Sequence, residues 1–210
     1  MTRANTALKA EHVYICGNSG TGKSSKIKAE IKKANRVIAF DPDNEYGAEA
    51  GFIKVTSAKE LALKIIEHKN TPLKIAFVAE GKEAFAHFCD CAFGWGNCAA
   101  IAEEIADVTS AGKAPPSWGR LIRRGRKFGI KILAVTQRPS EADKTILSNA
   151  ATINVFQLGR HADRKQIALE IDVSTDMLQQ MIPLEWVEFK RSDMSLKAGK
   201  LGTRRIKKIR

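Results

Sequence analysis

A glycine-rich segment near the start of the chain has the residue types needed to hold phosphate. Residues 17–24 read Gly-Asn-Ser-Gly-Thr-Gly-Lys-Ser and match the Walker A pattern G-x-x-x-x-G-K-S/T in full. In such a loop, backbone N–H groups converge on phosphate oxygens, Lys23 reaches the β- and γ-phosphates, and the Ser24 hydroxyl ligates Mg²⁺. We therefore expect ATP and Mg²⁺ as ligands. The expected nucleotide-binding residues are Gly17, Asn18, Ser19, Gly20, Thr21, Gly22, Lys23, Ser24 and Ser25.

Two adjacent carboxylates could serve a bound nucleotide. The apolar run at residues 98–102 is followed by Glu103 and Glu104. At the end of a strand, one carboxylate can hold the water shell of Mg²⁺ while its neighbour takes a proton from the attacking water. We assign Glu103 to the metal and Glu104 to the general base. Paired glutamates are also common where a helix begins, which leaves a structural role open.

A side-chain amide follows another apolar run, at residues 131–136. Gln137 can donate to the γ-phosphate and accept from water, as the water-orienting glutamines of other NTPases do. Because parallel strands end at one edge of a sheet, we expect Gln137 to face the phosphate loop. Lys23, Glu104 and Gln137 together predict ATP hydrolysis. A small-molecule kinase and a nucleotide-switched binding module remain the alternatives.

The elements that position these groups alternate along the chain. Short apolar runs suit strands buried on both faces of a parallel sheet. The runs lie at residues 12–16, 36–41, 74–79, 98–102, 131–136, 153–158 and 186–189. Helices are predicted between them, among others at residues 23–34, 57–68 and 120–128. The sequence thus predicts an α/β fold, with a mostly parallel sheet sandwiched by helices.

The chain end has a different pattern. Short strands and glycine turns after Pro183 predict a β-hairpin and a basic tail, so we expect an ATPase domain at residues 1–189 and a hairpin with its tail at residues 190–210. Nine basic residues and one acidic residue lie in the latter segment, and the whole chain has a net charge of +12. A second basic cluster spans residues 113–127. Such a surplus favours a polyanion as partner, although a solvated face is the alternative.

The sequence also bears on the compartment of the protein. No apolar run approaches the length of a transmembrane helix, and the N-terminus lacks the apolar core of a signal peptide. We therefore expect a cytoplasmic protein without a transmembrane segment. The four cysteines fit a compartment in which thiols stay reduced.

Four segments resemble the FtsK–HerA superfamily of DNA-pumping ATPases. They are residues 17–24, residues 37–47 (VIAFDPDNEYG), residues 101–104 and residues 125–140 (GRKFGIKILAVTQRPS). The resemblance implies a RecA-like (ASCE) domain that assembles into a homo-oligomeric, usually hexameric, ring around double-stranded DNA. It implies that Gln137 is the sensor and Arg126 a candidate for the arginine that acts on a neighbouring subunit. Arg123 and Arg124 are rivals for that role.

The adjacent glutamates narrow the resemblance. They and the stretch EEIADVTSAGK at residues 103–113 look like the genome-packaging ATPases of tectivirus- and corticovirus-type membrane-containing viruses. This likeness implies a translocase that packages viral DNA into a preformed capsid, in the host cytoplasm or at the packaging vertex of the virion. Capsid or vertex proteins and a membrane surface are the implied further contacts. Zot-like phage assembly ATPases and cellular HerA-type translocases are the alternatives.

Two further sets of residues have competing interpretations. Asp41 and Asp43 follow a predicted strand and could approach Mg²⁺, but an Asp-Pro-Asp-Asn turn accounts for them equally well. A histidine and three cysteines could bind zinc together, or the cysteines could simply be buried thiols. Their spacing lacks the C-x₂-C pair that is usual in zinc sites. These residues are His87, Cys89, Cys91 and Cys98.

Overall fold

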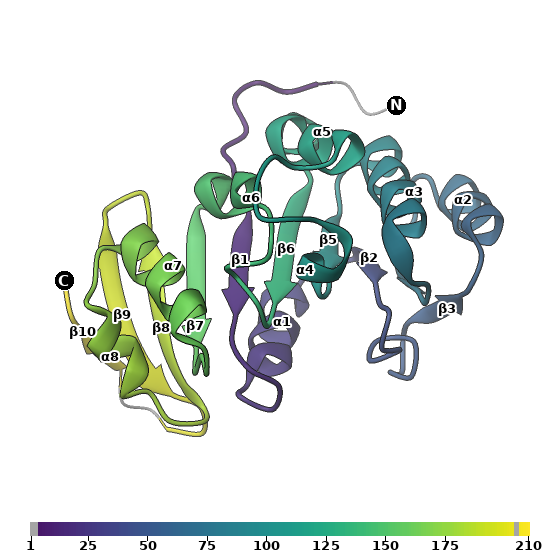
Figure 1. Cartoon of the computed structure of the whole chain (residues 1–210). Helices are drawn as coiled ribbons and strands as arrows, with labels where there is room; N and C mark the ends of the chain where they lie inside the picture. Colours follow the sequence, from purple (N-terminus) through teal and green to yellow (C-terminus); the bar gives the residue numbers. More distant parts are fainter. Residues whose placement is uncertain (1–3, 204–205) are drawn as a thin grey trace.

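Ten strands form a single sheet in the computed structural model, which describes residues 4–203 and 206–210 (Figure 1). The order is β10-β9-β8-β7-β1-β6-β5-β2-β4-β3. Strands β1 to β7 run parallel, and β8 to β10 continue the sheet antiparallel. The strands are β1 Val13–Cys16, β2 Arg36–Phe40, β3 Ile53–Val55, β4 Leu73–Phe77, β5 Ala99–Ala102, β6 Lys131–Thr136, β7 Thr152–Phe156, β8 Glu185–Lys190, β9 Ser195–Lys200 and β10 Ile206–Lys208.

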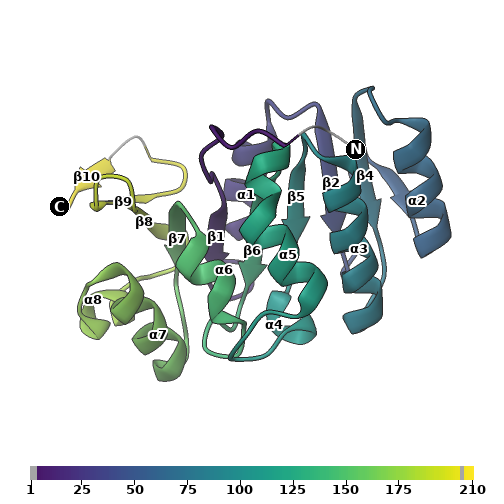
Figure 2. The same cartoon turned by 90° about the horizontal axis from the view of Figure 1, so that it is seen from above.

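Helices cover both faces of the parallel strands, as Figure 2 shows from above. The helices are α1 Lys23–Ile31, α2 Ala58–Glu67, α3 Gly81–Trp95, α4 Ile105–Val108, α5 Pro116–Arg124, the 3-10 helix η1 Gly125–Phe128, α6 Lys144–Asn149, α7 His161–Ile171 and α8 Thr175–Gln179. On one face α1 packs Ile27 and Ile31 against alternate strand residues such as Ile15. The other face carries a larger core, which includes Phe85 of α3 and Trp118 of α5. The predicted α/β class is confirmed.

Local signals account for where several elements begin and end. Ser57 caps α2, since its hydroxyl accepts from the N–H of Glu60 at 3.2 Å. The helix predicted over residues 120–128 is wrong in part, because α5 ends at Arg124 and the chain tightens into η1 before Gly129, whose φ is 70°. Strand β3 was not predicted. It has three residues, two of them exposed, and so presents no apolar run.

The predicted C-terminal hairpin is present as β8 and β9. The two strands pair over six residues, and β7 pairs with β8 over five, so the hairpin extends the central sheet. The expected boundary at residue 190 coincides with the last residue of β8 and divides the hairpin. Part of the expected basic tail, residues 204–205, lies outside the described residues. In the described ranges we find no helix both long and apolar enough to cross a bilayer.

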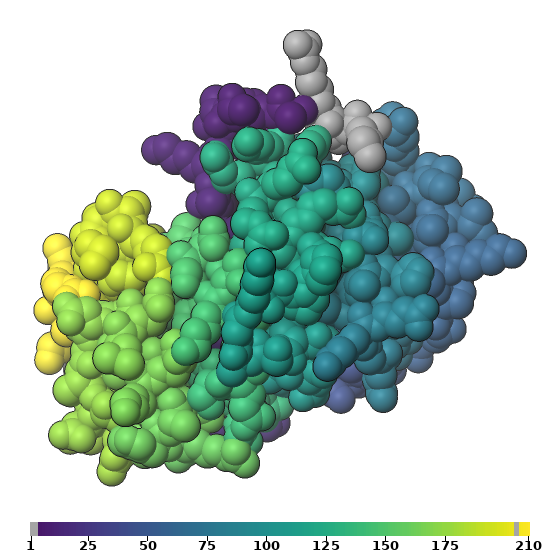
Figure 3. Space-filling model, turned by 45° about the horizontal axis from the view of Figure 1, so that its top comes forward, coloured from purple at the N-terminus to yellow at the C-terminus, as the bar shows by residue number. Residues whose placement is uncertain are grey.

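The parallel strands define two opposite edges. Their carboxyl ends meet near the start of α1, whereas α5, η1 and the N-terminal segment lie at their amino ends (Figure 1). The N–H of Asn5 donates to the carbonyl of Lys127 at 2.7 Å, and Figure 3 shows this segment in purple on the surface beside α5. We call these the carboxyl edge and the amino edge.

Candidate active site

The glycine-rich loop closes around the ammonium group of its own lysine. Lys23 Nζ donates to the carbonyls of Gly17 at 2.9 Å and Asn18 at 3.0 Å. The hydroxyl of Thr21 also donates to the carbonyl of Asn18, at 2.7 Å. These bonds hold the lysine buried at the centre of the loop, where a phosphate group would meet it.

Helix α1 begins directly at this loop. Its N-cap residue Gly22 has a φ of 115°, and no side chain caps the first turn. The N–H groups there remain available to an anion, and the helix dipole adds a partial positive charge. A Cβ on Gly22 would lie 2.3 Å from Leu201 Cδ1 and 3.1 Å from Phe156 Cε1. Glycine is therefore required here by both backbone conformation and space.

A cavity of about 300 Å³ lies at this loop on the carboxyl edge. Predicted site residues from separate segments converge in it: the phosphate-loop residues, the two glutamates and Gln137. Its lining consists of Ser19, Gly20, Gly22, Lys23, Ser24, Ser25, Asp41, Asp43, Glu45, Glu103, Glu104, Gln137 and Leu184. The remaining three predicted loop residues shape the loop without lining the cavity. They are Gly17, Asn18 and Thr21.

Glu104 and Gln137 are bonded to each other. They follow the neighbouring strands β5 and β6, which pair in parallel. Gln137 Nε2 donates to Glu104 Oε1 at 2.7 Å, and the Gln137 backbone N–H donates to Glu104 Oε2 at 3.2 Å. Glu104 has a φ of 42°, in the left-handed region that non-glycine residues seldom occupy. Such strain is typical of functional sites. The carboxylate of Glu104 and the amide of Gln137 therefore lie next to each other, where each could instead bond to a ligand in the cavity.

Glu103 lies in a very different environment. Its Oε1 accepts a 2.5 Å hydrogen bond from the hydroxyl of Tyr46, and its side chain is buried. Burial raises the pKa of Glu103 to about 8, although the bond from Tyr46 and the charge of Lys23 oppose the rise. Without a bound cation the carboxyl is thus largely protonated at neutral pH. A cation beside it would favour the ionised form.

The segment after β2 holds Tyr46 in place. Asp41 accepts from the backbone N–H groups of Glu45 at 2.8 Å, Tyr46 at 2.9 Å and Gly47 at 2.9 Å. These bonds support the interpretation of Asp41 as the residue that shapes a turn. Both Asp41 and Asp43 also line the cavity. Sequence reasoning missed Tyr46 and Glu45, although the segment VIAFDPDNEYG contains both.

The donor groups of the cavity suit Mg²⁺ together with a polyphosphate. Ser24 Oγ donates to Glu45 Oε2 at 3.1 Å, so its oxygen already faces a carboxylate. Five acidic side chains line the cavity, with one lysine among the described residues. An incoming polyphosphate therefore needs a cation to offset repulsion from those that are ionised. No three His, Cys, Asp or Glu side chains of the described ranges form a metal cluster. The protein thus offers part of a shell that phosphate oxygens and water can complete.

Arg126 lies far from this cavity. It belongs to η1 at the amino edge, where its Nη1 donates to the carbonyl of Leu8 at 2.7 Å. The six residues of β6 separate η1 from Gln137, which amounts to about 20 Å of strand. Arg123 and Arg124 lie in the last turn of α5, at the same edge. None of the three arginines lines the cavity of its own subunit.

The candidate zinc ligands form no metal-binding group within the part of the chain that the structure describes. Cys89 and Cys98 are buried, and burial raises the pKa of both thiols above the usual value. His87 is exposed on α3, with its ring near the carbonyl of Glu83. This arrangement supports the interpretation of Cys89 and Cys98 as packed thiols.

Comparison with curated proteins shows a relative that matches nearly the whole chain. Protein P9 of Pseudoalteromonas phage PM2 is 32% identical over 195 residues, covering 89% of this chain and 88% of the phage protein. The DNA double-strand break repair helicase HerA of Sulfurisphaera tokodaii is 32% identical over 68 residues, covering 32% of this chain and 14% of the helicase. No protein-family model matches.

Solved structures share the fold. The genome packaging NTPase B204 of Sulfolobus turreted icosahedral virus 2, in complex with ATP-gammaS, superposes with a TM-score of 0.73. The match covers 91% of this chain and 97% of that one at 16% identity. B204 of Sulfolobus turreted icosahedral virus matches at 0.68 and 18% identity, with 91% and 98% covered. The similarity therefore extends over the whole domain, well beyond the glycine-rich loop.

Proposed function

The chain belongs to the FtsK–HerA-type P-loop ATPases related to protein P9 of phage PM2, and we propose that it hydrolyses ATP to move double-stranded DNA into a viral capsid. One observation carries the ATPase part of this proposal. The phosphate loop, the glutamate pair and Gln137 come from separate elements and line one cavity. The DNA part is supported by the similarity to B204, a genome packaging NTPase, and by the basic residues 190–210 of this chain.

Glu104 and Gln137 have different roles toward the attacking water: Glu104 is the general base, and Gln137 senses the γ-phosphate. Glu104 accepts a proton from the water, whose oxygen then bonds to the γ-phosphorus while the bond to the β-phosphate oxygen breaks. ADP and inorganic phosphate result. The Gln137 amide donates to the Glu104 carboxylate at 2.7 Å. A γ-phosphate offers the Gln137 amide another acceptor, which releases the carboxylate to meet water.

The loop binds the phosphates. Lys23 exchanges its bonds to the loop carbonyls for bonds to the β- and γ-phosphates, and the free N–H groups of α1 add further donors. Ser24 and Glu103 would hold Mg²⁺, which neutralises charge on the phosphate oxygens. Tyr46 fixes the position of the Glu103 carboxyl through their 2.5 Å bond.

A neighbouring subunit completes the site. Arg126 is too far from the cavity of its own chain, so we assign it to the nucleotide of an adjacent subunit in a homo-oligomeric ring. A cation that arrives across an interface stabilises charge that develops in the transition state. Arg123 and Arg124 are the alternatives at the same edge. We assign ATP turnover to residues 1–189 and DNA contact chiefly to residues 190–210.

The proposal is tested by phosphate release with and without duplex DNA, alongside displacement of a triplex-forming strand from that duplex. We expect DNA to stimulate phosphate release and the motor to displace the strand. Lys23→Ala serves as the inactive control, and sizing in ATPγS reports ring formation. Strand displacement without ATP turnover, or no turnover in any assembly state, contradicts the proposal. Phosphate that appears on a small-molecule acceptor instead of in solution identifies a kinase.

A further inference from the structure

The C-terminal hairpin touches the nucleotide cavity. Leu184, which directly precedes β8, lines the cavity and contributes the one hydrocarbon side chain among its described lining residues. Its φ is 70°, a left-handed conformation unfavourable for a bulky side chain. The cavity is therefore lined at one point by a nonpolar side chain from the residue that leads into the hairpin.

A second leucine joins the hairpin to the phosphate loop. Leu201 follows β9, and its N–H donates to the carbonyl of Leu184 at 2.9 Å. Leu201 Cδ1 lies 2.3 Å from where a Cβ on Gly22 would be, so it packs directly on the loop. The two leucines thus contact the cavity and the loop at once, and a backbone hydrogen bond ties them together.

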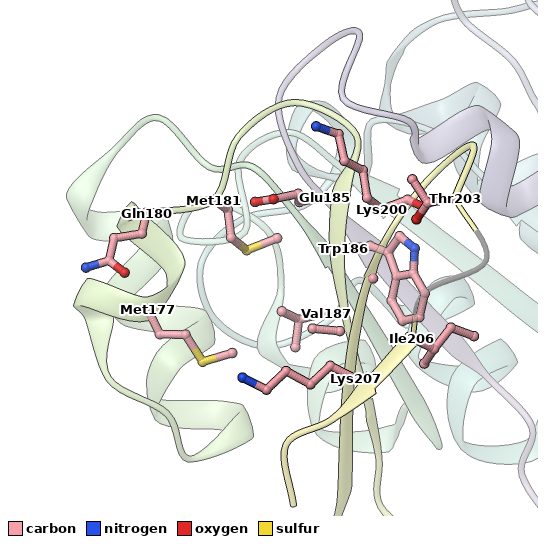
Figure 4. A pocket seen from close by; sticks show the side chains of 12 residues that line it. Met177, Gln180, Met181, Glu185, Trp186, Val187, Lys200, Thr203, Ile206 and Lys207 are labelled. Carbon is pink, nitrogen blue, oxygen red and sulfur yellow. The ribbon is translucent and has the colours of Figure 1, made fainter.

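Lysines lie on the two C-terminal strands that follow β8, which are β9 and β10. Strands β8 and β9 pair over six residues, and Trp186 of β8 packs on Gly199 of β9. Beyond them, β10 pairs with β9 and has its residues fully on the surface. Trp186, Lys200 and Lys207 are among the residues that line a second cavity, of about 940 Å³. Figure 4 shows their side chains. This larger cavity lacks the phosphate loop and the glutamate pair, so we place the nucleotide in the smaller one.

We propose that Leu184 and Leu201 couple the nucleotide site to DNA binding by the basic hairpin. This inference rests on the proposed function and names its coupling element. A nucleotide that contacts Leu184 stabilises its hydrogen bond to Leu201. The strands that carry Lys200, Lys207 and Lys208 are thereby held in one arrangement. A ligand shifts an equilibrium only through an element with which it interacts differently in the two states, and the two leucines provide that element. DNA and nucleotide then strengthen each other's binding by the same factor.

Affinity for a 30-base-pair DNA duplex, measured with and without ATPγS, tests the coupling. We expect ATPγS to tighten DNA binding about five-fold or more in the wild type. In Leu201→Ala we expect the coupling factor to fall toward one, because that factor compares DNA affinity with and without ATPγS in the same variant, whatever the affinity for either ligand alone. Leu201→Met should restore it, because its side chain can still reach the loop. Leu63→Ala, an exposed truncation on α2, is the matched control and should leave the factor unchanged.

Amide hydrogen exchange separates this inference from the proposed function. ATPγS alone should slow exchange at Leu201 and along β9 in the wild type, and should do so much less in Leu184→Ala. Unchanged exchange in the nucleotide-bound wild type overturns the coupling, whether or not DNA stimulates turnover. Full coupling in Leu201→Ala overturns it too. If exchange slows but no DNA binds, the leucine link stands and the DNA function fails. A protein that binds no nucleotide refutes both.

Discussion

The carboxyl edge and the amino edge of the sheet belong to the same strands yet differ in chemistry. At the carboxyl edge, β5 and β6 end in Glu104 and Gln137, which bond to each other beside a cavity with five carboxylates. At the amino edge, α5 and η1 present a run of basic residues without an acidic one. There His12 is buried, and its ring lies between the carbonyl of Ile122 and the N–H of Ile132.

This difference shows that the net charge of +12 does not describe the nucleotide site. The charged side chains that line the cavity are mostly acidic, so it favours an anion only when a divalent cation accompanies it. The surplus of cations lies elsewhere, at the amino edge and on the C-terminal strands. The two proposed phosphate ligands, nucleotide and DNA, would therefore bind different parts of the surface.

The largest effect is expected from Lys23→Ala at the carboxyl edge. The β- and γ-phosphates lose their cation, so ATP binding should weaken and hydrolysis should fall below detection. Phosphate release and equilibrium binding of a fluorescent ATP analogue measure the two effects. Turnover at the wild-type rate would remove the phosphate-site assignment.

Arg126→Ala tests whether the amino edge serves a neighbour's nucleotide. We expect nearly normal ATP binding and a loss of turnover of about 10³-fold, as for other arginines that act across an interface. In mixtures with Lys23→Ala subunits some activity should return, because the intact Lys23 sites can receive Arg126 from the neighbour. The measurement is the ATPase rate across mixing ratios under conditions of subunit exchange.

One outcome of the mixing experiment would contradict the assignment of Arg126. If exchanged rings recover no activity at any ratio, the assignment moves from Arg126 to Arg123 or Arg124. The control is a mixture of Lys23→Ala with Glu104→Gln subunits, all of which keep Arg126. This mixture should stay inactive, because every subunit lacks a residue of its own site.

The two glutamates should respond differently to the same change. Glu104→Gln should bind ATP and stall before hydrolysis, with a loss of about 10²- to 10³-fold, because an amide cannot accept the proton from water. Glu103→Gln should instead raise the Mg²⁺ concentration needed for turnover. Rapid-quench measurement of bound ATP and a Mg²⁺ titration distinguish the two. If Glu103→Gln traps ATP and Glu104→Gln remains active, the roles are reversed.

DNA binding by the basic residues 190–210 is better tested by substitution than by deletion. Removal of residues 190–210 would take away β9, the pairing partner of β8, along with Leu201. Lys207→Gln with Lys208→Gln alters two exposed side chains of β10 instead. The slope of log K against log salt for duplex DNA should become shallower by about 2, because two phosphate contacts are lost. The pair Lys59→Gln and Lys69→Gln, exposed at the far end of the sheet, should leave the slope unchanged.

The smallest effect concerns two buried groups at opposite edges. The pKa of Glu103 rises from 4.5 to about 8, so the folded protein retains a proton that the unfolded chain releases, and stability falls as pH rises between these values. Burial lowers the pKa of His12 from 6.5 to about 4, so its contribution is lost as pH falls below 6.5. Between pH 6.5 and 8, only the Glu103 effect of this pair operates.

Melting temperatures in EDTA at pH 6.5 and pH 8 measure that effect. We expect the free energy of unfolding of the wild type to fall by about 1 to 2 kcal/mol over this range through Glu103. In Glu103→Gln the decrease should be smaller by that amount. An equal decrease in both proteins would show that Glu103 ionises freely in the fold.

The elements that could be predicted from the sequence are those whose signal lies in contiguous residues. The phosphate loop, the strand before it and the helix after it are contiguous, so pattern and spacing were sufficient to predict them. The same holds for the parallel strands, whose continuous apolar runs reflect burial on both faces. The sequence also predicted that Glu104 and Gln137 would lie near the phosphate loop, because the carboxyl ends of adjacent parallel strands such as β5 and β6 lie together.

Tertiary structure decided the contacts between distant parts of the chain. Tyr46 reaches Glu103 across 57 positions, and the raised pKa of Glu103 depends on burial that no local pattern encodes. Leu184 and Leu201 come to the phosphate loop because β8 and β9 add to β7, which pairs with β1 immediately before that loop. The reason is physical: backbone periodicity is set by neighbours in sequence, whereas burial, charge environment and side-chain contact are set by neighbours in space.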